Sequence, residues 1–146
     1  MSSIFNSRTE LNTAVAAWIA DEAAATSTYG DINTWDVSAI SDFSNLFRNR
    51  TTFNSDISNW DVSNGTSFSG MFLNLDSSSF NQDISSWDVS NGTDFGYMFY
   101  GTDAFNQDIS SWDVSNGTYF TGMFSDSDFN QDIGSWDVSN GTDFSS

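Results

Sequence analysis

The chain of 146 residues carries 20 aspartates and glutamates against three arginines, which gives a formal net charge of −17, and it has no lysine, histidine, cysteine or proline. Such an acidic surface repels nucleic acid and anionic membrane surfaces, and the lack of cysteine excludes a disulfide, a thiol nucleophile and a cysteine metal site. No stretch approaches the roughly 20 apolar residues of a membrane-spanning helix, so we expect neither nucleic-acid binding nor membrane insertion.

The first predicted element is one long helix over residues 7–26. Ser7 and Glu10 begin and end a Ser-x-x-Glu capping box, in which both side chains satisfy free amides at a helix N-terminus. An apolar stripe follows at helical spacing: Leu11, Val15, Trp18 and Ile19. We expect residues 1–28 to form an N-terminal helical cap over the first coil of the region that follows. The alternative is an amphipathic helix that binds a partner.

From residue 29 onward the sequence is a tandem repeat. Five tryptophans are each followed by Asp-Val-Ser, at spacings of 25, 27, 25 and 24 residues: Trp35, Trp60, Trp87, Trp112 and Trp136. A period in this range is typical of stacked supersecondary units. Residues 29–146 are therefore predicted to form four to five coils, the last of them incomplete, with the tryptophans as a structural core ladder. A row of ligand-stacking platforms is the alternative.

Each unit is predicted to hold a short strand, a turn and a short helix. In the second unit the strand carries apolar residues at i, i+3 and i+5, the spacing of leucine-rich repeats: Ile57, Trp60 and Val62. Asn-Gly-Thr then forms a turn in which glycine takes a positive φ and threonine caps the next helix. That helix carries apolar residues at i, i+3 and i+4: Phe68, Met71 and Phe72. The expected fold class is an α/β repeat solenoid with leucine-rich-repeat-like coils of about 25 residues and an N-terminal capping helix.

Stacking these units would place aspartates in two columns. One column lies on the predicted strands: Asp36, Asp61, Asp88, Asp113 and Asp137. The other precedes it: Asp31, Asp56, Asp83, Asp108 and Asp132. Neighbouring coils would bring like carboxylates to about 5 Å, where repulsion in water is on the order of 1 kcal/mol per pair. Two interpretations stay open: hydrogen bonds from backbone amides and nearby serines and asparagines, or Ca²⁺ held between coils with the first column as candidate metal ligands.

Asparagines repeat at two further positions. We interpret one set as a buried ladder that satisfies backbone groups at the bend of each coil, with a ligand-facing row as the alternative: Asn54, Asn81, Asn106 and Asn130. The other set begins each Asn-Gly-Thr and indicates a turn.

No catalytic site stands out in the sequence. Reactions near neutral pH generally use a histidine, a cysteine, an activated serine or lysine, or two carboxylates with separated pKa values. Only the carboxylates are available here, and their equivalence in successive coils singles out no acid and nucleophile. We therefore expect no enzymatic activity, no catalytic residue and no cofactor apart from the hypothesised Ca²⁺.

A family resemblance rests on the segment from Phe105 to Asn116 and on Met123-Phe124 downstream of it. The segment reads Phe-Asn-Gln-Asp-Ile-Ser-Ser-Trp-Asp-Val-Ser-Asn. It resembles the repeat of the BspA-type surface proteins, known as the Mycoplasma-type lipoprotein repeat of unknown function, over about residues 29–146. The resemblance implies a right-handed leucine-rich-repeat-like solenoid in an exported or surface-attached bacterial protein implicated in adhesion. Asn-Gly-Thr stands here where that family more often has Asn-Val-Thr, and the family has no established catalytic residues.

The expected function is non-catalytic recognition. A surface or adhesion module would bind a protein or a glycan through its repeated face by many weak, equivalent contacts. The resemblance implies an extracellular or cell-surface location, although no signal peptide is visible. The alternatives are a structural element that forms homo-oligomers through an uncapped C-terminal end, and a Ca²⁺-stabilised solenoid.

Overall fold

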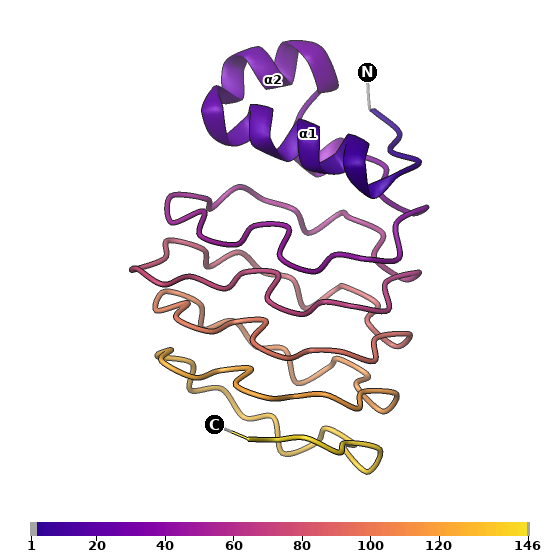
Figure 1. Cartoon of the computed structure of the whole chain (residues 1–146), viewed down its shortest axis with the longest axis vertical. Coiled ribbons are helices and arrows are strands. Elements are labelled where there is room, and N and C mark those ends of the chain that lie inside the picture. Colours follow the sequence, from indigo (N-terminus) through magenta and orange to yellow (C-terminus); the bar gives the residue numbers. More distant parts are fainter. Residues whose placement is uncertain (1–2, 146) are drawn as a thin grey trace.

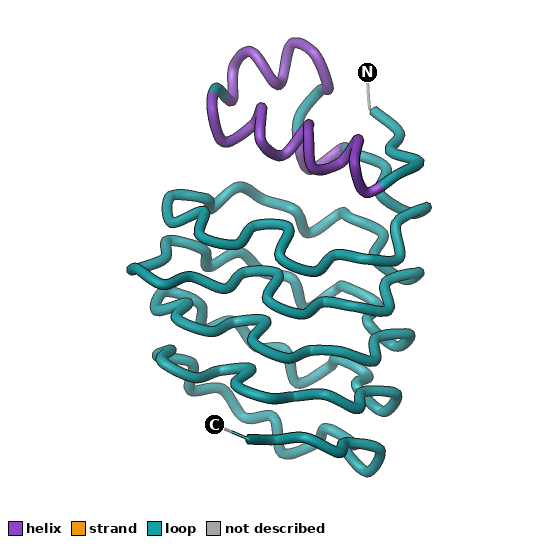
Figure 2. Tube along the Cα trace, in the orientation of Figure 1, coloured by secondary structure: helices purple, strands orange, loops and turns teal. Residues whose placement is uncertain are grey.

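The computed structural model describes residues 3–145 and shows a stack of irregular coils with two helices at one end (Figure 1). α1 spans Arg8–Ala20, α2 spans Glu22–Tyr29, and a short 3-10 helix, η1, spans Ile32–Thr34. Beyond η1 the described chain consists of loops and turns (Figure 2), and its coils pair through isolated parallel bridges.

The single helix predicted over residues 7–26 is instead two helices that meet at Asp21. The helix start is as predicted, because the Ser7 side chain accepts a hydrogen bond from the Glu10 amide. Asp21 follows α1 in an extended conformation, and its carboxylate accepts the amide of Ala24 at 3.0 Å. A carboxylate that caps a new helix competes with continuation of the previous one, so the chain changes direction here.

α1 covers the first coil of the stack. Its buried residues are Leu11, Ala14, Val15 and Trp18. The Trp18 indole meets the Trp35 indole edge to face, with ring centroids 5.8 Å apart. One hydrophobic cluster includes both the helices and the coils. The division into a helical cap, residues 1–28, and a repeat region, residues 29–146, stays a prediction; residues 1, 2 and 146 lie outside the described part of the chain.

The predicted fold class, a right-handed α/β solenoid with a strand and a helix in every unit, is wrong. Residues 3–145 contain two α-helices and one 3-10 helix, all before residue 35, and no sheet. The predicted helix at Phe68 does not form because its amides bond to another coil. Phe68 N donates to Asp94 O and Phe72 N donates to Met98 O. Gly70, between them, has a φ of +61°, which a right-handed helix excludes.

The strand predicted at Trp60 and Val62 is also absent. Amides here close local turns, from Trp60 N to Ile57 O and from Gly65 N to Val62 O. Parallel bridges form instead at a later position in each coil: Asp42, Ser67, Asp94, Tyr119 and Asp143. Glycine in Asn-Gly-Thr is needed for close approach and not for a positive φ, since a β-carbon on Gly65 would lie 2.5 Å from the Phe68 ring.

Columns of stacked phenylalanine rings join successive coils. In one column neighbouring centroids are 5.3–5.6 Å apart: Phe43, Phe68, Phe95, Phe120 and Phe144. A second column stacks at 5.5–5.7 Å: Phe47, Phe72, Phe99 and Phe124. A third stacks at 5.8–6.0 Å: Phe53, Phe80, Phe105 and Phe129. Because burying one such ring contributes about 1.5–3 kcal/mol, these columns and not regular secondary structure supply the main stabilisation of the coils.

Candidate functional site

Four of the five repeat tryptophans lie in the interior of the stack, and the fifth, Trp136 in the last described coil, is partly buried. Trp35 stacks on Trp60 at 6.4 Å, and the last three indoles stack at 6.4–6.5 Å. From Trp60 onward each indole N–H donates to an isoleucine carbonyl of the preceding coil. The indoles of the first four are buried. This column therefore packs the core with its polar atoms satisfied, and it offers no open row of platforms to a ligand.

Each aspartate of the first predicted column forms a turn with the serine two residues later. All five carboxylates accept that serine's backbone amide at 3.0–3.1 Å: Asp36, Asp61, Asp88, Asp113 and Asp137. At Asp36 and Asp88 the serine hydroxyl adds a bond of 2.6 Å. Hydrogen bonds from the serine hydroxyl and then the amide stabilise the charged carboxylate, so they lower the pKa of Asp36 and of Asp88.

The second predicted column uses the same local arrangement. Its aspartates accept the backbone amide two residues later at 2.8–2.9 Å: Asp31, Asp56, Asp83, Asp108 and Asp132. Hydrogen bonds from Ser85 lower the pKa of Asp83, and they outweigh the opposing repulsion from Asp108 in the next coil. Local hydrogen bonding thus lowers the pKa of Asp83 by more than the like-charge repulsion between coils raises it.

Sequence analysis missed a third set of such turns beside the parallel bridges. Asp42, Asp94 and Asp143 accept the amides of residues 44, 96 and 145 at 2.9–3.0 Å. Ser67 and Tyr119 occupy the equivalent positions in the intervening coils, so this set has no unbroken period in the sequence.

Calcium binding by the aspartate columns stays a hypothesis. Within residues 3–145 no three or more acidic side chains come together in an arrangement that could hold a metal ion. One oxygen of each aspartate in both columns already accepts a backbone amide, which supports the hydrogen-bond interpretation.

The asparagine ladder forms at the predicted positions but on the surface. Asn54 Oδ1 accepts the amide of Asn81, and the next two coils repeat this bond at 2.9–3.0 Å. Gln82 and its equivalents donate side-chain N–H groups to the same asparagines. The prediction of backbone partners is confirmed, whereas the prediction of burial is wrong because these asparagines are exposed.

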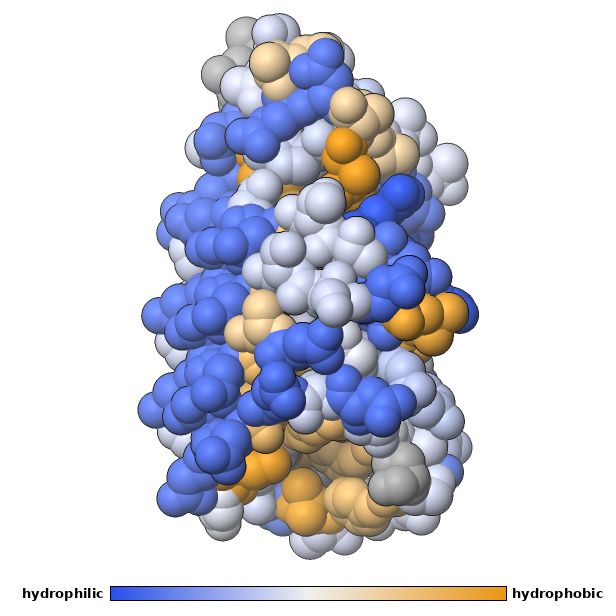
Figure 3. Space-filling view, turned by 90° about the vertical axis from the view of Figure 1, so that its left-hand side faces the viewer, coloured by the Kyte–Doolittle hydropathy of each residue, from blue (hydrophilic) through white to orange (hydrophobic). Residues whose placement is uncertain are grey.

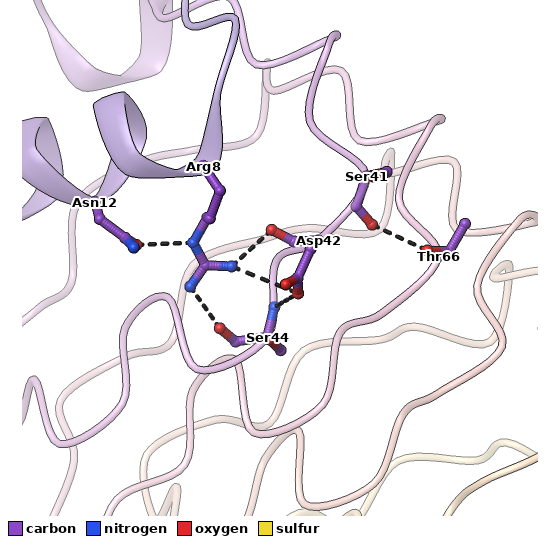
Figure 4. A network of polar contacts seen from close by, with 6 residues as sticks. All are labelled: Arg8, Asn12, Ser41, Asp42, Ser44 and Thr66. Carbon is purple, nitrogen blue, oxygen red and sulfur yellow. Dashed lines mark hydrogen bonds and ion pairs between the residues drawn. The ribbon is translucent and has the colours of Figure 1, made fainter.

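Arg8 anchors α1 to the first coil (Figure 4). Its guanidinium donates to the Asn12 side chain and to the carbonyls of Asp42 and Ser44, and it lies 3.6 Å from the Asp42 carboxylate. Burial lowers the pKa of Arg8, and attraction to Asp42 offsets only part of this. Burial acts to raise the pKa of Asp42, but hydrogen bonds from Ser44 and the Arg8 charge bring it below its ordinary value. No periodicity in the sequence marks this anchor.

The bridge face, which we define as residues 42–45, 67–70, 94–97 and 119–122, differs in residue type from coil to coil. By contrast, the 14 residues 80–93 are identical to residues 105–118. Two large side chains stand exposed on the bridge face, Tyr97 at 43% and Tyr119 at 53% of their surface. Residues 80–93 and 105–118 thus keep the same side chains at buried and exposed positions alike, whereas the bridge face combines one buried phenylalanine per coil with mostly exposed or half-buried positions that vary.

Tyr97 occupies an unfavourable backbone conformation. Its φ is +55°, and the equivalent residues in other coils are Asn45, Gly70 and Gly122, which adopt this region more readily. The Tyr97 ring lies against Gly122, where a β-carbon would come within 2.6 Å of it. The Tyr100 ring meets it edge to face at 6.1 Å. Tyr97 thus presents an exposed aromatic side chain from a costly backbone conformation beside the half-buried Tyr100, and strained residues of this kind cluster at binding sites.

A stack of tandem coils with a shared aromatic interior defines a repeat protein. The family model described as "Mycoplasma protein of unknown function, DUF285" matches two overlapping segments, residues 21–128 and 90–146. The chain belongs to this family. No curated protein and no solved structure matches the chain. Among the described residues, no helix has both the length and the apolar character needed to cross a membrane.

Replacing Ser90 by alanine tests the cause of the carboxylate shifts. The variant loses the hydroxyl bond to Asp88 and keeps the amide bond, so the pKa of Asp88 should rise toward its ordinary value of about 3.9. A lowered pKa contributes stability that is present above that ordinary value and is lost as the pH falls through the folded pKa. Carbon-detected NMR titration of the carboxyl group measures the shift. Ser86→Ala, whose hydroxyl donates to the Ser58 carbonyl, is the control and should leave Asp88 unchanged.

The calcium hypothesis has a separate test. If ions bind between coils of the native protein, millimolar CaCl₂ should raise the melting temperature above that in NaCl of equal ionic strength, and a chelator should reverse the rise. Asp88→Asn with Asp113→Asn should diminish it. Equal melting temperatures in the two salts would reject calcium binding.

Proposed function

We propose that this chain is a non-catalytic recognition module that binds a protein or a glycan at a cell surface through its bridge face. The observation that carries the proposal is the exposed Tyr97 in a left-handed conformation, beside Tyr100 and on the same face as Tyr119. Tyrosine offers a large amphipathic contact area at a small entropic cost, which suits both protein surfaces and sugar rings.

The chemistry of the rest of the surface supports binding without turnover. Aspartates are the principal titratable groups along the coils, and their oxygens are held in short local turns. Such carboxylates accept hydrogen bonds from a partner's hydroxyl or amide groups, and the lowered pKa values of Asp83 and Asp88 make these two side chains poor proton donors near neutral pH. A net charge of −17 disfavours nucleic acid as the partner.

The proposal includes a narrower family assignment for the chain. Within the family described as Mycoplasma proteins of unknown function, we place the chain among the BspA-type surface proteins, on the repeated Phe-Asn-Gln-Asp-Ile-Ser-Ser-Trp-Asp-Val-Ser-Asn motif. An adhesion role outside the cell follows from that placement.

The substitution Tyr97→Gly should separate binding from stability. Glycine relieves the left-handed strain, so the free energy of unfolding should stay level or rise by up to about 1 kcal/mol. Binding to a printed array of defined oligosaccharides and purified extracellular proteins should be saturable for the unaltered chain and weaker by at least about tenfold for the variant.

Leu75→Ser is the matched control, because Leu75 is an exposed apolar residue outside the bridge face. It should bind the array as the unaltered chain does, and Tyr119→Ser should resemble Tyr97→Gly. If no array member binds, or if both tyrosine variants bind normally, the proposal fails.

A further inference from the structure

Loops of successive coils lie together on one edge of the stack, at the left of Figure 1, and Figure 3 looks onto that edge, where hydrophilic side chains are frequent over the middle coils. These loops span residues 73–79, 100–104 and 125–128. They enclose a hollow of about 400 Å³, which we call the loop hollow and whose lining includes Asn74, Asp76, Tyr100, Asp103 and Asp126. No repeated motif marks this hollow, because each coil contributes a loop of different sequence to it.

The loop hollow is acidic and its lining contains no basic residue. Asp76, Asp103 and Asp126 are exposed around it. Within residues 3–145 the ion pair that an arginine forms joins Arg8 to Asp42, neither of which lines the hollow. Three carboxylates without a neighbouring positive charge attract cations, so the hollow favours a cationic ligand.

Asn74 brings to this hollow a buried acceptor that has no partner. Its exposed fraction is 2%, and its Oδ1 accepts no hydrogen bond within the described part of the chain. Its Nδ2 donates to Phe72 O at 2.8 Å, so the planar amide is fixed in orientation and Oδ1 is the amide atom left for the hollow. Buried polar atoms are nearly always hydrogen-bonded, and this oxygen therefore indicates a donor that comes from outside the chain.

The neighbouring coils show why Asn74 Oδ1 lacks a partner. At the equivalent position one coil earlier, Asn49 Oδ1 accepts the backbone amide of Leu75 at 3.1 Å. The corresponding donor for Asn74 is the amide of Thr102, which donates to a carbonyl of its own coil instead. The side-chain ladder between coils is thus interrupted at the loop hollow.

The spread of the carboxylates suits a ligand larger than a metal ion. Among residues 3–145 no three acidic side chains gather closely enough to hold a metal ion, so the three aspartates stand apart around the hollow. A volume of about 400 Å³ lies in the range of pockets for organic ligands. The ligand that fits is an organic cation with several N–H donors, because carboxylates and the Asn74 oxygen can only accept.

Tyr100 gives the hollow an aromatic surface beside a fixed carboxylate. Its hydroxyl donates to Asp126 Oδ2 at 2.6 Å, and its ring meets that of Tyr97 edge to face. The hydrogen bond to Asp126, and then the charge of that carboxylate, raise the pKa of Tyr100, so the hydroxyl keeps its proton and its contact. A planar guanidinium group can stack on such a ring while its N–H groups bind carboxylates, which an ammonium group does less well.

We propose that the loop hollow binds an arginine side chain of a protein partner. The guanidinium group donates to the carboxylates around the hollow and to the Asn74 carbonyl oxygen, and it lies against the Tyr100 ring. This inference rests on the proposed recognition function, because the arginine belongs to the partner that contacts Tyr97 next to the hollow. It narrows that partner to a protein, and arginine is one of the residues enriched at protein interfaces.

A nuclear magnetic resonance titration of the isotope-labelled 146-residue chain tests the site with the blocked tripeptide acetyl-Gly-Arg-Gly-amide. We expect saturable binding with a dissociation constant on the order of 1 mM, and shifts of the Asn74 side-chain amide and of the Tyr100 backbone amide. A matched peptide with citrulline in place of arginine has nearly the same shape without the charge and should bind at least about tenfold more weakly. Added NaCl should weaken binding of the arginine peptide, because it screens exposed carboxylates.

Two pairs of substitutions separate the hollow from the overall charge. Asp103→Asn with Asp126→Asn keeps the shape of both side chains and an oxygen for the Tyr100 hydroxyl, and it should weaken binding of the arginine peptide at least about tenfold. Asp108→Asn with Asp132→Asn makes the same change in net charge outside the loop hollow and should alter binding less than about twofold. Unchanged circular dichroism shows that both variants are folded.

Several results would overturn the proposal. Equal binding of the arginine and citrulline peptides, no saturable binding of either, or equal weakening in the two pairs of variants would each contradict it. If glucosamine hydrochloride shifts the Asn74 and Tyr100 signals and the arginine peptide does not, the hollow belongs to an amino sugar of a glycan. If CaCl₂ alone shifts them, it belongs to a metal ion.

The array test of the bridge face has a separate outcome. Arginine-peptide binding without any array partner would reject the proposed function and leave the hollow as an arginine site. Array binding that depends on Tyr97, without binding of the arginine peptide, would reject only this inference. Leu75 also borders the hollow, but its side chain offers no acceptor to a guanidinium group, so Leu75→Ser remains a control for the bridge face.

Discussion

Ring-on-ring stacking between successive coils is the interaction on which the rest of the structure depends. Equivalent rings lie 5.3–6.0 Å apart along the three phenylalanine columns, and three pairs of repeat tryptophans stack at 6.4–6.5 Å: Trp35–Trp60, Trp87–Trp112 and Trp112–Trp136. An inner ring of a phenylalanine column contacts its equivalent on both sides, so one coil buries little of its surface alone and neighbouring coils stabilise each other. The sequence therefore repeats at a regular period, because an aromatic residue out of register would lose its contacts with the equivalent rings of both neighbouring coils.

The spacing of the coils determines which partners the backbone amides and carbonyls bond to. With coils held at this distance, amides alternate between local turns and carbonyls of the next coil, as Met71 N bonds to Phe68 O and Phe72 N bonds to Met98 O. Aspartates and asparagines close the remaining turns, so no continuous strand or helix is needed to satisfy the chain. Exposed positions outside the stacked columns, such as Tyr97 and Tyr119, are then not constrained by the coil on either side to one residue type, and the proposed recognition function uses them.

The sequence predicted the structural features that depend on the repeat period, and it did not predict the features that are independent of that period. The register of Trp35, Trp60 and their equivalents could be read from a five-fold motif, and Ser7 from its local capping pattern. The helix expected at Phe68 was wrong because i, i+3, i+4 spacing also fits a turn whose amides bond to the next coil, a choice that local sequence does not distinguish. The exposed, left-handed Tyr97 could not be foreseen, because asparagine or glycine holds the equivalent position in the other coils and no repeated motif marks it.

Native-state hydrogen exchange of individual amides tests the central claim most directly. The amides of Gly70, Phe72 and Phe95 lie in segments without regular secondary structure, yet each donates across coils at 2.8–2.9 Å. If aromatic stacking holds the coils as one cooperative body, these amides should exchange only through global unfolding, as slowly as the slowest amides of α1. Exchange at the rate of an unstructured chain, while α1 stays protected, would contradict the account.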